Sequence, residues 1–500
     1  MNVANTILSA GNNSAPALIY RQEVLTYAEL RQKVMRCSTT FLGRNHAKGD
    51  RIGIFSENNP FFVVSYLSII RAGLVAVPFQ TELTEQDFKR IVSDAGIEDV
   101  CVSRRFINRL LPLAKRLNLN LLTEDDFENG NKKPLPLPVI DSARDLAALM
   151  FTSGSTGHAK GVMVTHRNIE CNTRDIISYM DLTANDRVMV LLPFHYCFGA
   201  SLLHSHLMAG GSLVLNNNFA FPETVLQEMQ ARGCTGLAGV PSTFQILLRK
   251  SRLCEMNFPE LRWFQQAGGK LPNACIEELV TAFPDVCYYL MYGQTEATAR
   301  LSYLPPERLV DKMGSIGKGL PSTRLDVLKP DGSPVQPGSN EIGEIVASGD
   351  NITAGYWNDP EETLRYFKSG RLHTGDMARV DADGFIFIVE RERELIKCKG
   401  NRVSAKEIEE VIAEIPGVIE TAVVGTPDEI FGEAICAFIL GAPGAHLTAD
   451  LVEGHCHKRL PPFKVPTRIE LIGQMPHNGA GKIAKLKLKE LAAAVALRTR

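Results

Sequence analysis

The stretch LAALMFTSGSTGHAKGVMVTHRN, residues 146–168, decides the fold. An apolar run enters a loop of hydroxyls and glycines, a lysine follows, and a second apolar run reaches a helix start at Thr165. Gly154 and Gly157 let the backbone turn its N–H groups toward one point, and Lys160 adds a positive charge. The stretch therefore predicts a strand followed by an anion-binding loop that suits a polyphosphate. The loop offers further hydrogen-bond donors in the hydroxyls of Thr152, Ser153, Ser155 and Thr156.

This loop differs from the common nucleotide P-loop. That motif has the pattern G-x-x-x-x-G-K-[ST], in which the last hydroxyl holds Mg²⁺. Here Gly154, Gly157 and Lys160 follow each other at intervals of three, and Gly161 stands after the lysine. A flexible Ser/Gly loop without a ligand is the alternative, and the motifs further along the chain decide between the two.

Composition limits the class of protein. At 500 residues, with 45% hydrophobic and 22% charged residues, the chain has the make-up of a soluble globular protein of two or more domains. A net charge of −2 argues against a nucleic-acid binder. The 11 cysteines are scattered without a C-x-x-C pair, which favours reduced thiols in a cytoplasmic protein.

No segment has the pattern of an integral membrane span or a signal peptide. The longest apolar passage, residues 61–79, is split by Arg71 and Gly73 into a predicted buried helix and a short strand. The start at Met1 lacks a basic region and a long apolar run. We expect this apolar passage to belong to the core.

The order of strands and helices predicts an α/β fold with much parallel sheet. Thr26 and Glu29 have capping-box spacing before a helix that ends near Gly43. From about Asp326 the pattern changes to short strands and turns, with a hairpin at Asp383-Gly384. Because a dense charged segment follows, we place a boundary between domains 1–391 and 392–500.

In combination, the motifs resemble the adenylate-forming superfamily: acyl- and aryl-CoA synthetases, peptide-synthetase adenylation domains and firefly-type luciferases. The resemblance is greatest to AMP-forming acyl-CoA synthetases and covers nearly the whole chain. It implies a large N-terminal domain of layered α/β sheets with a small β-barrel-like subdomain, then a small mobile α+β C-terminal domain. The motifs are Thr152–Gly161, Tyr292–Glu296, Gly314–Gly317, Thr374–Asp376, Gly400 with Glu407–Glu409, and Gly481–Lys482.

The implied reaction joins two anions, so charge must be neutralised as the carboxylate attacks the α-phosphate of ATP. By resemblance, the loop from Thr152 to Lys160 holds the β- and γ-phosphates. Glu296 carries Mg²⁺, a hard cation that prefers oxygen ligands, and Thr295 touches the α-phosphate. Lys482 reaches in from the small domain to bridge the carboxylate and the phosphate.

The remaining nucleotide contacts are implied in the same way. Tyr292 lies along the adenine, next to Gly268 and Gly269, and Gly293 is a further residue of the nucleotide site. Asp376 accepts hydrogen bonds from the ribose, with Arg391 beside it.

Two further residues are implied to act at the acyl and thiol sites. His195 stands where relatives have an aromatic residue that gates the acyl pocket, and Gly400 lines the pantetheine channel.

Each of these residues also has a simpler explanation. Glu296 would suit a helix N-terminus, and Asp376 would suit a turn. Lys482 would be one more solvated lysine in a lysine-rich tail, and His195 would be a satisfied core histidine.

Two departures from the family pattern affect function. The hinge before the small domain has Glu390 and Arg393 where other residues are usual. Tyr196 and Cys197 stand where amino-acid-activating relatives have an aspartate, which disfavours an α-amino acid as the substrate. We expect an acyl or aryl acid in a mixed apolar and weakly polar pocket of Tyr196, Phe198, Val240, Thr243, Phe244, Gln266 and Ala267.

The predicted function is ATP-dependent activation of a carboxylic acid, then acyl transfer to coenzyme A. The same adenylation with transfer to the phosphopantetheine of a separate carrier protein is the close alternative. A catalytically silent binding protein and a phosphotransferase are less consistent with the residues, whereas a luciferase-like oxygenase, which would use the same adenylate, stays open. A homo-oligomer stays open.

Overall fold

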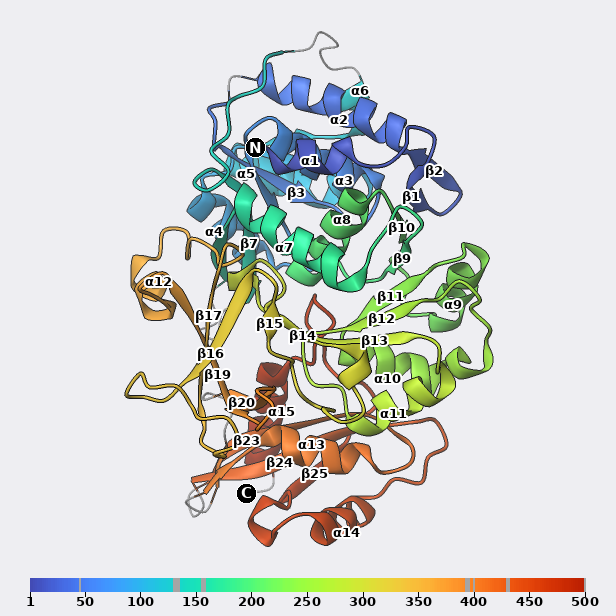
Figure 1. Ribbon diagram of the computed structural model, residues 1–500, viewed down its shortest axis with the longest axis vertical. Coiled ribbons are helices and arrows are strands. Elements are labelled where there is room, and N and C mark those ends of the chain that lie inside the picture. The colour runs from blue at the N-terminus through green and yellow to red at the C-terminus, as the bar shows by residue number, and fades with distance from the viewer. Residues whose placement is uncertain are drawn as a thin grey trace.

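The computed structural model describes residues 1–44, 46–128, 135–153, 159–391, 396–398, 401–428 and 432–498. The chain runs from a large upper part to a small lower part that ends at the C-terminus (Figure 1). The layered α/β fold with a small C-terminal unit confirms the expected fold class.

Two sheets of mainly parallel strands form the large part. The first has the order β6 (Asn120–Leu122), β5 (Asp99–Val102), β3 (Arg51–Phe55), β4 (Val75–Pro78), β7 (Leu146–Ser153), β8 (Ala159–Thr165). The second has the order β14 (Ser302–Leu304), β13 (Cys287–Tyr292), β12 (Trp263–Gln266), β11 (Gly236–Gly239), β9 (Arg187–Val190), β10 (Ser212–Leu215), β1 (Pro16–Tyr20), β2 (Glu23–Thr26).

Helices lie between and around these sheets. The helices of the large part are α1 (Val3–Ser9), α2 (Tyr27–Leu42), α3 (Pro60–Arg71), α4 (Glu85–Ala95), α5 (Ile107–Leu117), α6 (Glu124–Glu128), α7 (His166–Met180), α8 (Cys197–Ala209), α9 (Pro222–Ala231), α10 (Pro241–Lys250), α11 (Asn273–Ala282) and α12 (Pro360–Tyr366). One core cluster draws side chains from both sheets and from α3, α7 and α8. Those helices therefore join the two sheets, with α7 and α8 side by side (Figure 1).

Local sequence signals account for these helix starts. Thr26 and Glu29 form the expected capping box at the start of α2. Thr165 caps α7 by accepting from the Asn168 N–H. The apolar passage at residues 61–79 forms α3 and β4, both buried, as expected.

A small antiparallel sheet follows, where a β-rich subdomain is expected. Its order is β15 (Gly319–Leu320), β16 (Thr323–Leu328), β17 (Gly343–Gly349), β19 (Arg371–Val380), β18 (Phe367–Lys368), with β20 (Ile386–Arg391) also paired to β19. The β19–β20 hairpin turns at Gly384, which has φ +83° and so favours glycine.

The last sheet has the order β22 (Asn401–Val403), β21 (Ile396–Cys398), β24 (Gly432–Gly441), β23 (Val418–Asp428), with β25 (Arg468–Leu471) beside β24. Side chains of α13 (Ala405–Ala413) and α14 (Ala449–Arg459) join one core cluster of this sheet, and α15 (Lys485–Arg498) joins another. Residues 392–395 lie outside the described part, so the expected boundary at 391/392 and the hinge role of Arg393 stay predictions.

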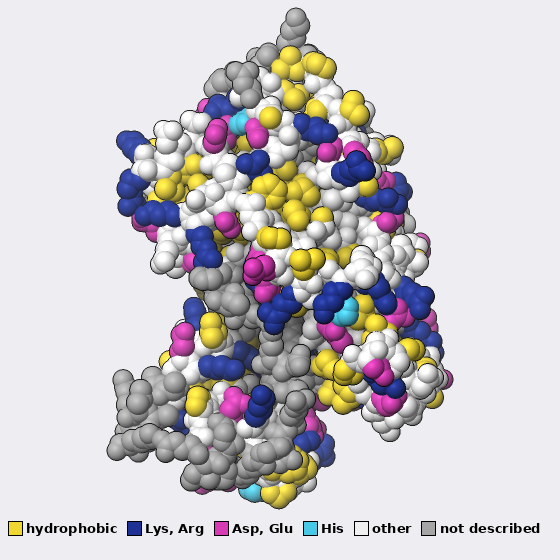
Figure 2. Space-filling view, turned by 90° about the vertical axis from the view of Figure 1, so that its left-hand side faces the viewer, with side chains coloured by type: hydrophobic (Ala, Val, Ile, Leu, Met, Phe, Trp, Pro, Cys, Tyr) yellow, Lys and Arg dark blue, Asp and Glu magenta, His cyan; other side chains and the backbone are white. Residues whose placement is uncertain are grey.

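Other expectations concern charge, thiols and membranes. All eleven cysteines are free. Within the described ranges, no helix is long and apolar enough to cross a membrane, and no group of three metal-ligating side chains is present. Basic and acidic side chains are interspersed on the face shown in Figure 2.

Candidate active site

Lys482 reaches the large part of the molecule from the small one. Its loop is held by Asn478, whose side-chain oxygen accepts from the Lys482 N–H at 3.0 Å. The Lys482 Nζ lies 5.2 Å from the centre of the Tyr196 ring. A Cβ on Gly268 would stand 2.9 Å from both Lys482 Cε and Tyr196 Oη, so a side chain at this glycine would displace the lysine.

Two further contacts hold this loop in place. Ser242, at the start of α10, donates to the Gly481 carbonyl at 2.6 Å. His195 hydrogen-bonds to the backbone of Gly479, and burial lowers the pKa of His195 to about 4, against the opposing effects of Glu82 and of this hydrogen bond. His195 is therefore neutral near pH 7 and lies beside the loop that carries Lys482.

Two of the predicted nucleotide residues, Tyr292 and Asp376, meet where the end of β13 lies beside the middle of β19. Tyr292 donates to Asp376 Oδ2 at 2.5 Å, and Asp376 is only 2% exposed. The β19–β20 register places the backbone of Arg391 opposite Asp376. A Cβ on Gly293 would stand 1.8 Å from the Ala299 carbonyl oxygen, so close packing explains this glycine. Gly269 accepts from Gln266 Nε2 at 2.8 Å.

The phosphate-binding prediction concerns residues at the end of β7, at the start of β8 and between these two strands. Thr152 pairs with Lys160 in the β7–β8 ladder, and Ser153 is the last residue of β7. Gly154, Ser155, Thr156 and Gly157 lie outside the described residues, as does Gly400.

Lys160 is linked to Glu296 through an aromatic side chain. The Lys160 Nζ lies 2.5 Å from Glu362 Oε2 and 5.4 Å from the centre of the Tyr356 ring. Tyr356 in turn donates to Glu296 Oε1 at 2.7 Å. The Lys160 ion pair lowers the pKa of Glu362, whereas burial and the nearby Glu296 raise that of Tyr356.

Glu296 lies on a short 3₁₀ turn, Thr295–Ala297, whose backbone is held from outside. The Glu296 carbonyl accepts from the N–H and the hydroxyl of Thr353 at 3.0 and 2.9 Å. Thr298 directly after the turn has φ +67°, a strained value for a β-branched residue. Thr295 donates to Cys197 Sγ at 3.4 Å, and burial raises the pKa of Cys197.

The expected acyl pocket is brought together in part. Tyr196, Phe198, Val240 and Ala267 share one core cluster, whereas Phe244 packs in another cluster with Phe264 and Tyr288. Phe244 therefore lies away from Tyr196, because α10 turns this side chain toward a different core.

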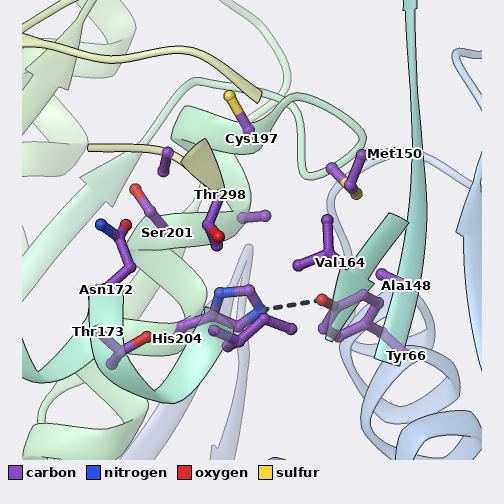
Figure 3. A pocket seen from close by; sticks show the side chains of 13 residues that line it. Tyr66, Ala148, Met150, Val164, Asn172, Thr173, Cys197, Ser201, His204 and Thr298 are labelled. Carbon is purple, nitrogen blue, oxygen red and sulfur yellow. Dashed lines mark hydrogen bonds between the residues drawn. The ribbon is translucent and has the colours of Figure 1, made fainter. Parts of the chain in front are cut away.

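A small pocket lies behind the Glu296 turn, between α7, α8 and β7 (Figure 3). Cys197, Ser201, Asn172 and Thr298 line it, and His204 Nε2 meets the Tyr66 hydroxyl at 3.0 Å on its wall. Its volume of about 10 Å³ suits a single water molecule, so it is too small for an acyl chain.

Several residues at this site escaped the sequence prediction. Tyr356 and Glu362 lie outside the motifs, and Arg300 and Gln265 carry no pattern that marks them as buried neighbours of Phe198. Only the period-2 alternation of β12 would have placed Gln265 and Trp263 on one face.

Comparisons with known proteins agree with this geometry. The family model of AMP-binding enzymes matches residues 9–357, and that of the AMP-binding enzyme C-terminal domain matches residues 407–482. Feruloyl-CoA synthase of Amycolatopsis sp is 31% identical over 474 residues, 94% of each chain. Oxalate–CoA ligase of Arabidopsis thaliana is 30% identical over 478 residues, 92% of each chain.

Among solved structures, ATP-bound MatB from Rhodopseudomonas palustris has 26% sequence identity and a TM-score of 0.86, with 98% of each chain covered. The apo form of the same protein gives a TM-score of 0.77. The arrangement described here is thus closer to the ATP-bound form.

The chain belongs to the AMP-binding enzyme family. Within that family it is an AMP-forming acid–thiol ligase of the acyl-CoA synthetase type, which activates a carboxylic acid as the acyl-adenylate and transfers the acyl group to coenzyme A. The function predicted from the motifs is thereby confirmed.

Proposed function

We propose that Lys482 is the residue that joins the two substrates in the adenylation step. The observation that carries this proposal is its position over Tyr196 and against Gly268, in a loop that the small C-terminal sheet supplies to the large part. A cation at this point neutralises charge as the carboxylate oxygen bonds to the α-phosphorus and pyrophosphate leaves. The attacking carboxylate is already ionised, so this step needs no general base.

The nucleotide residues act by positioning. Asp376, oriented by the Tyr292 hydroxyl, accepts hydrogen bonds from the ribose, and the Tyr292 ring lies along the adenine. Lys160 exchanges Glu362 for the terminal phosphates when ATP binds, because its 12% exposed side chain lies on the strand that follows the Gly/Ser loop. Thr295 touches the α-phosphate.

Glu296 is the proposed Mg²⁺ ligand. Mg²⁺ is usually held by one or two carboxylates together with substrate phosphates and water, so the single Glu296 carboxylate fits this ion. When bound, Mg²⁺ supplies charge neutralisation on the phosphate oxygens. Tyr356 fixes the Glu296 carboxylate for this purpose through its 2.7 Å hydrogen bond.

The second step requires a different arrangement of the small domain. We place the moving unit at residues 392–500 and the pivot near Arg393, with Gly400 beside the incoming pantetheine. Coenzyme A is the acceptor that the similarity to CoA ligases supports, and a separate carrier protein is the alternative. Reduced thiols and the lack of a membrane helix in the described ranges support a cytoplasmic location.

ATP–pyrophosphate exchange with a panel of fatty, aryl, dicarboxylic and amino acids tests this proposal, followed by detection of acyl-CoA. Acid-dependent exchange with acyl-CoA as product supports it. Exchange without formation of acyl-CoA would indicate that the acyl acceptor is a carrier protein and not coenzyme A. No exchange with any acid, or ADP in place of AMP as product, would overturn it.

A further inference from the structure

Arg300 is a buried cation without an anionic partner. It is 1% exposed, and among the described residues no ion pair of its guanidinium with a carboxylate is found. Its Nη2 donates to Gln265 Oε1 at 3.1 Å, its Nε meets the weak acceptor Met291 Sδ at 3.1 Å, and its guanidinium also hydrogen-bonds to the Tyr179 side chain, so its described partners are all uncharged. Since arginine keeps its charge inside proteins, burial without a counter-ion is costly and calls for an explanation.

Neighbouring groups also lack acceptors. The Nε2 of Gln265, whose oxygen already binds Arg300, has no hydrogen-bond partner, and neither has the indole Nε1 of Trp263. Both side chains are buried and lie two residues apart on β12, so they project from the same face of the sheet. Two buried donors of this strand, the Gln265 amide and the Trp263 indole, therefore have no acceptor.

The position of Arg300 relates it to the reacting centre. Its guanidinium carbon lies 4.1 Å from the centre of the Phe198 ring, and the Phe198 ring packs edge-on against Tyr196 at 6.3 Å. Tyr196 is the ring over which Lys482 lies. One pair of rings thus separates the two cations, with Lys482 at one end and Arg300 at the other.

The backbone of Arg300 is held firmly. Asn172 accepts from its N–H at 3.2 Å and donates to its carbonyl at 2.9 Å, and Asn351 donates to the same carbonyl at 2.9 Å. The backbone that carries the side chain is thereby fixed, and the guanidinium is oriented by Phe198 and Gln265, as a binding group needs to be.

We propose that the acid activated by this enzyme carries a second carboxylate, at the end remote from the one that is adenylated, and that Arg300 binds it. This inference rests on the proposed function and names its substrate class as a dicarboxylic acid with an aliphatic or aromatic spacer. The planar guanidinium matches a carboxylate, and the Gln265 amide adds a further donor. A neutral group at this place would leave the charge of Arg300 unpaired.

The test compares dicarboxylic acids with their own monomethyl esters in ATP–pyrophosphate exchange. The panel holds α,ω-dicarboxylic acids of increasing length and the benzene dicarboxylic acids. We expect the best diacid to exceed its monoester about 100-fold in kcat/KM, the effect of losing one buried charge partner. Arg300→Met lowers this ratio about 100-fold, and Arg300→Lys lowers it less because the charge is kept.

Arg324→Met, at an exposed arginine of β16, is the matched control and leaves the ratio unchanged. If Arg300→Met does not fold, the wild-type panel and Arg300→Lys still decide the question. Preference for monocarboxylic acids, or an equal loss toward diacid and monoester in the Arg300 variants, would overturn the inference while the proposed function stands. No exchange with any acid would overturn both.

Discussion

The Ser242 hydroxyl donates a 2.6 Å hydrogen bond to the carbonyl of Gly481, the residue before Lys482. This contact joins the start of α10 in the large part to the loop that the small part contributes. It therefore belongs to the arrangement that we propose for adenylation, in which Lys482 lies over Tyr196.

Replacing Ser242 by alanine removes this contact. Because one neutral hydrogen bond contributes about 1 kcal/mol, we expect adenylation to slow about fivefold. The reaction of supplied acyl-adenylate with thiol stays unchanged, since it uses the other arrangement. Ser251→Ala at the end of the same helix is the control, and both half-reactions are measured separately. Equal slowing of both half-reactions would contradict the role assigned to Ser242.

Lys482→Ala removes the cation that we propose to face the two reacting anions. We expect adenylate formation to fall about 1,000-fold, in the range seen when one preorganised charge donor is lost. Thioester formation from supplied acyl-adenylate stays largely intact. Lys489→Ala, at an exposed lysine of the same tail, is the control. Parallel loss of both steps would argue against a lysine that acts in only one arrangement.

Tyr356→Phe leaves the Glu296 carboxylate without its 2.7 Å hydrogen bond. Loss of a group that orients a metal ligand weakens metal binding about 10-fold or more. We therefore expect the Mg²⁺ concentration for half-maximal exchange to rise about 10-fold, with Tyr20→Phe as the control. An unchanged Mg²⁺ requirement would show that Tyr356 does not support the metal ligand.

Stability should fall in mild acid because several histidines are buried in the neutral form. Burial lowers the pKa of His166 and His206 to about 4 and that of His204 to about 3. The unfolded chain takes up these protons from about pH 6.5 downward, whereas the folded chain does not. The free energy of unfolding therefore decreases as the pH falls from about 6.5 toward 4. We expect a loss of about 1–2 kcal/mol for each histidine between pH 7 and pH 5.

Urea unfolding at pH 7 and pH 5 measures this loss. His204→Gln keeps a hydrogen-bonding partner for Tyr66 but does not titrate, so it should reduce the pH dependence by about the share of one histidine. His457→Gln, at an exposed position of α14, should leave it unchanged. An identical pH dependence in His204→Gln and the wild type would refute this account.

The sequence by itself determined the order of strands and helices and the candidate motifs. Some features depend only on residues that are close in the sequence. These are the helix caps at Thr26 and Thr165, the division of residues 61–79 into a helix and a strand, and the turn at Gly384. Lys482 and Asp376 were named as candidates because each lies in a short motif of the family, and their roles stay predictions.

Only the tertiary structure decided which distant side chains meet. Tyr292 and Asp376 are 84 residues apart in the chain, and Lys160 and Glu362 are 202 residues apart. Burial of Arg300 depends on Phe198, Gln265 and Met291, which come from α8, β12 and β13. Such contacts follow from how the sheets and helices pack, and no periodicity within one element encodes them.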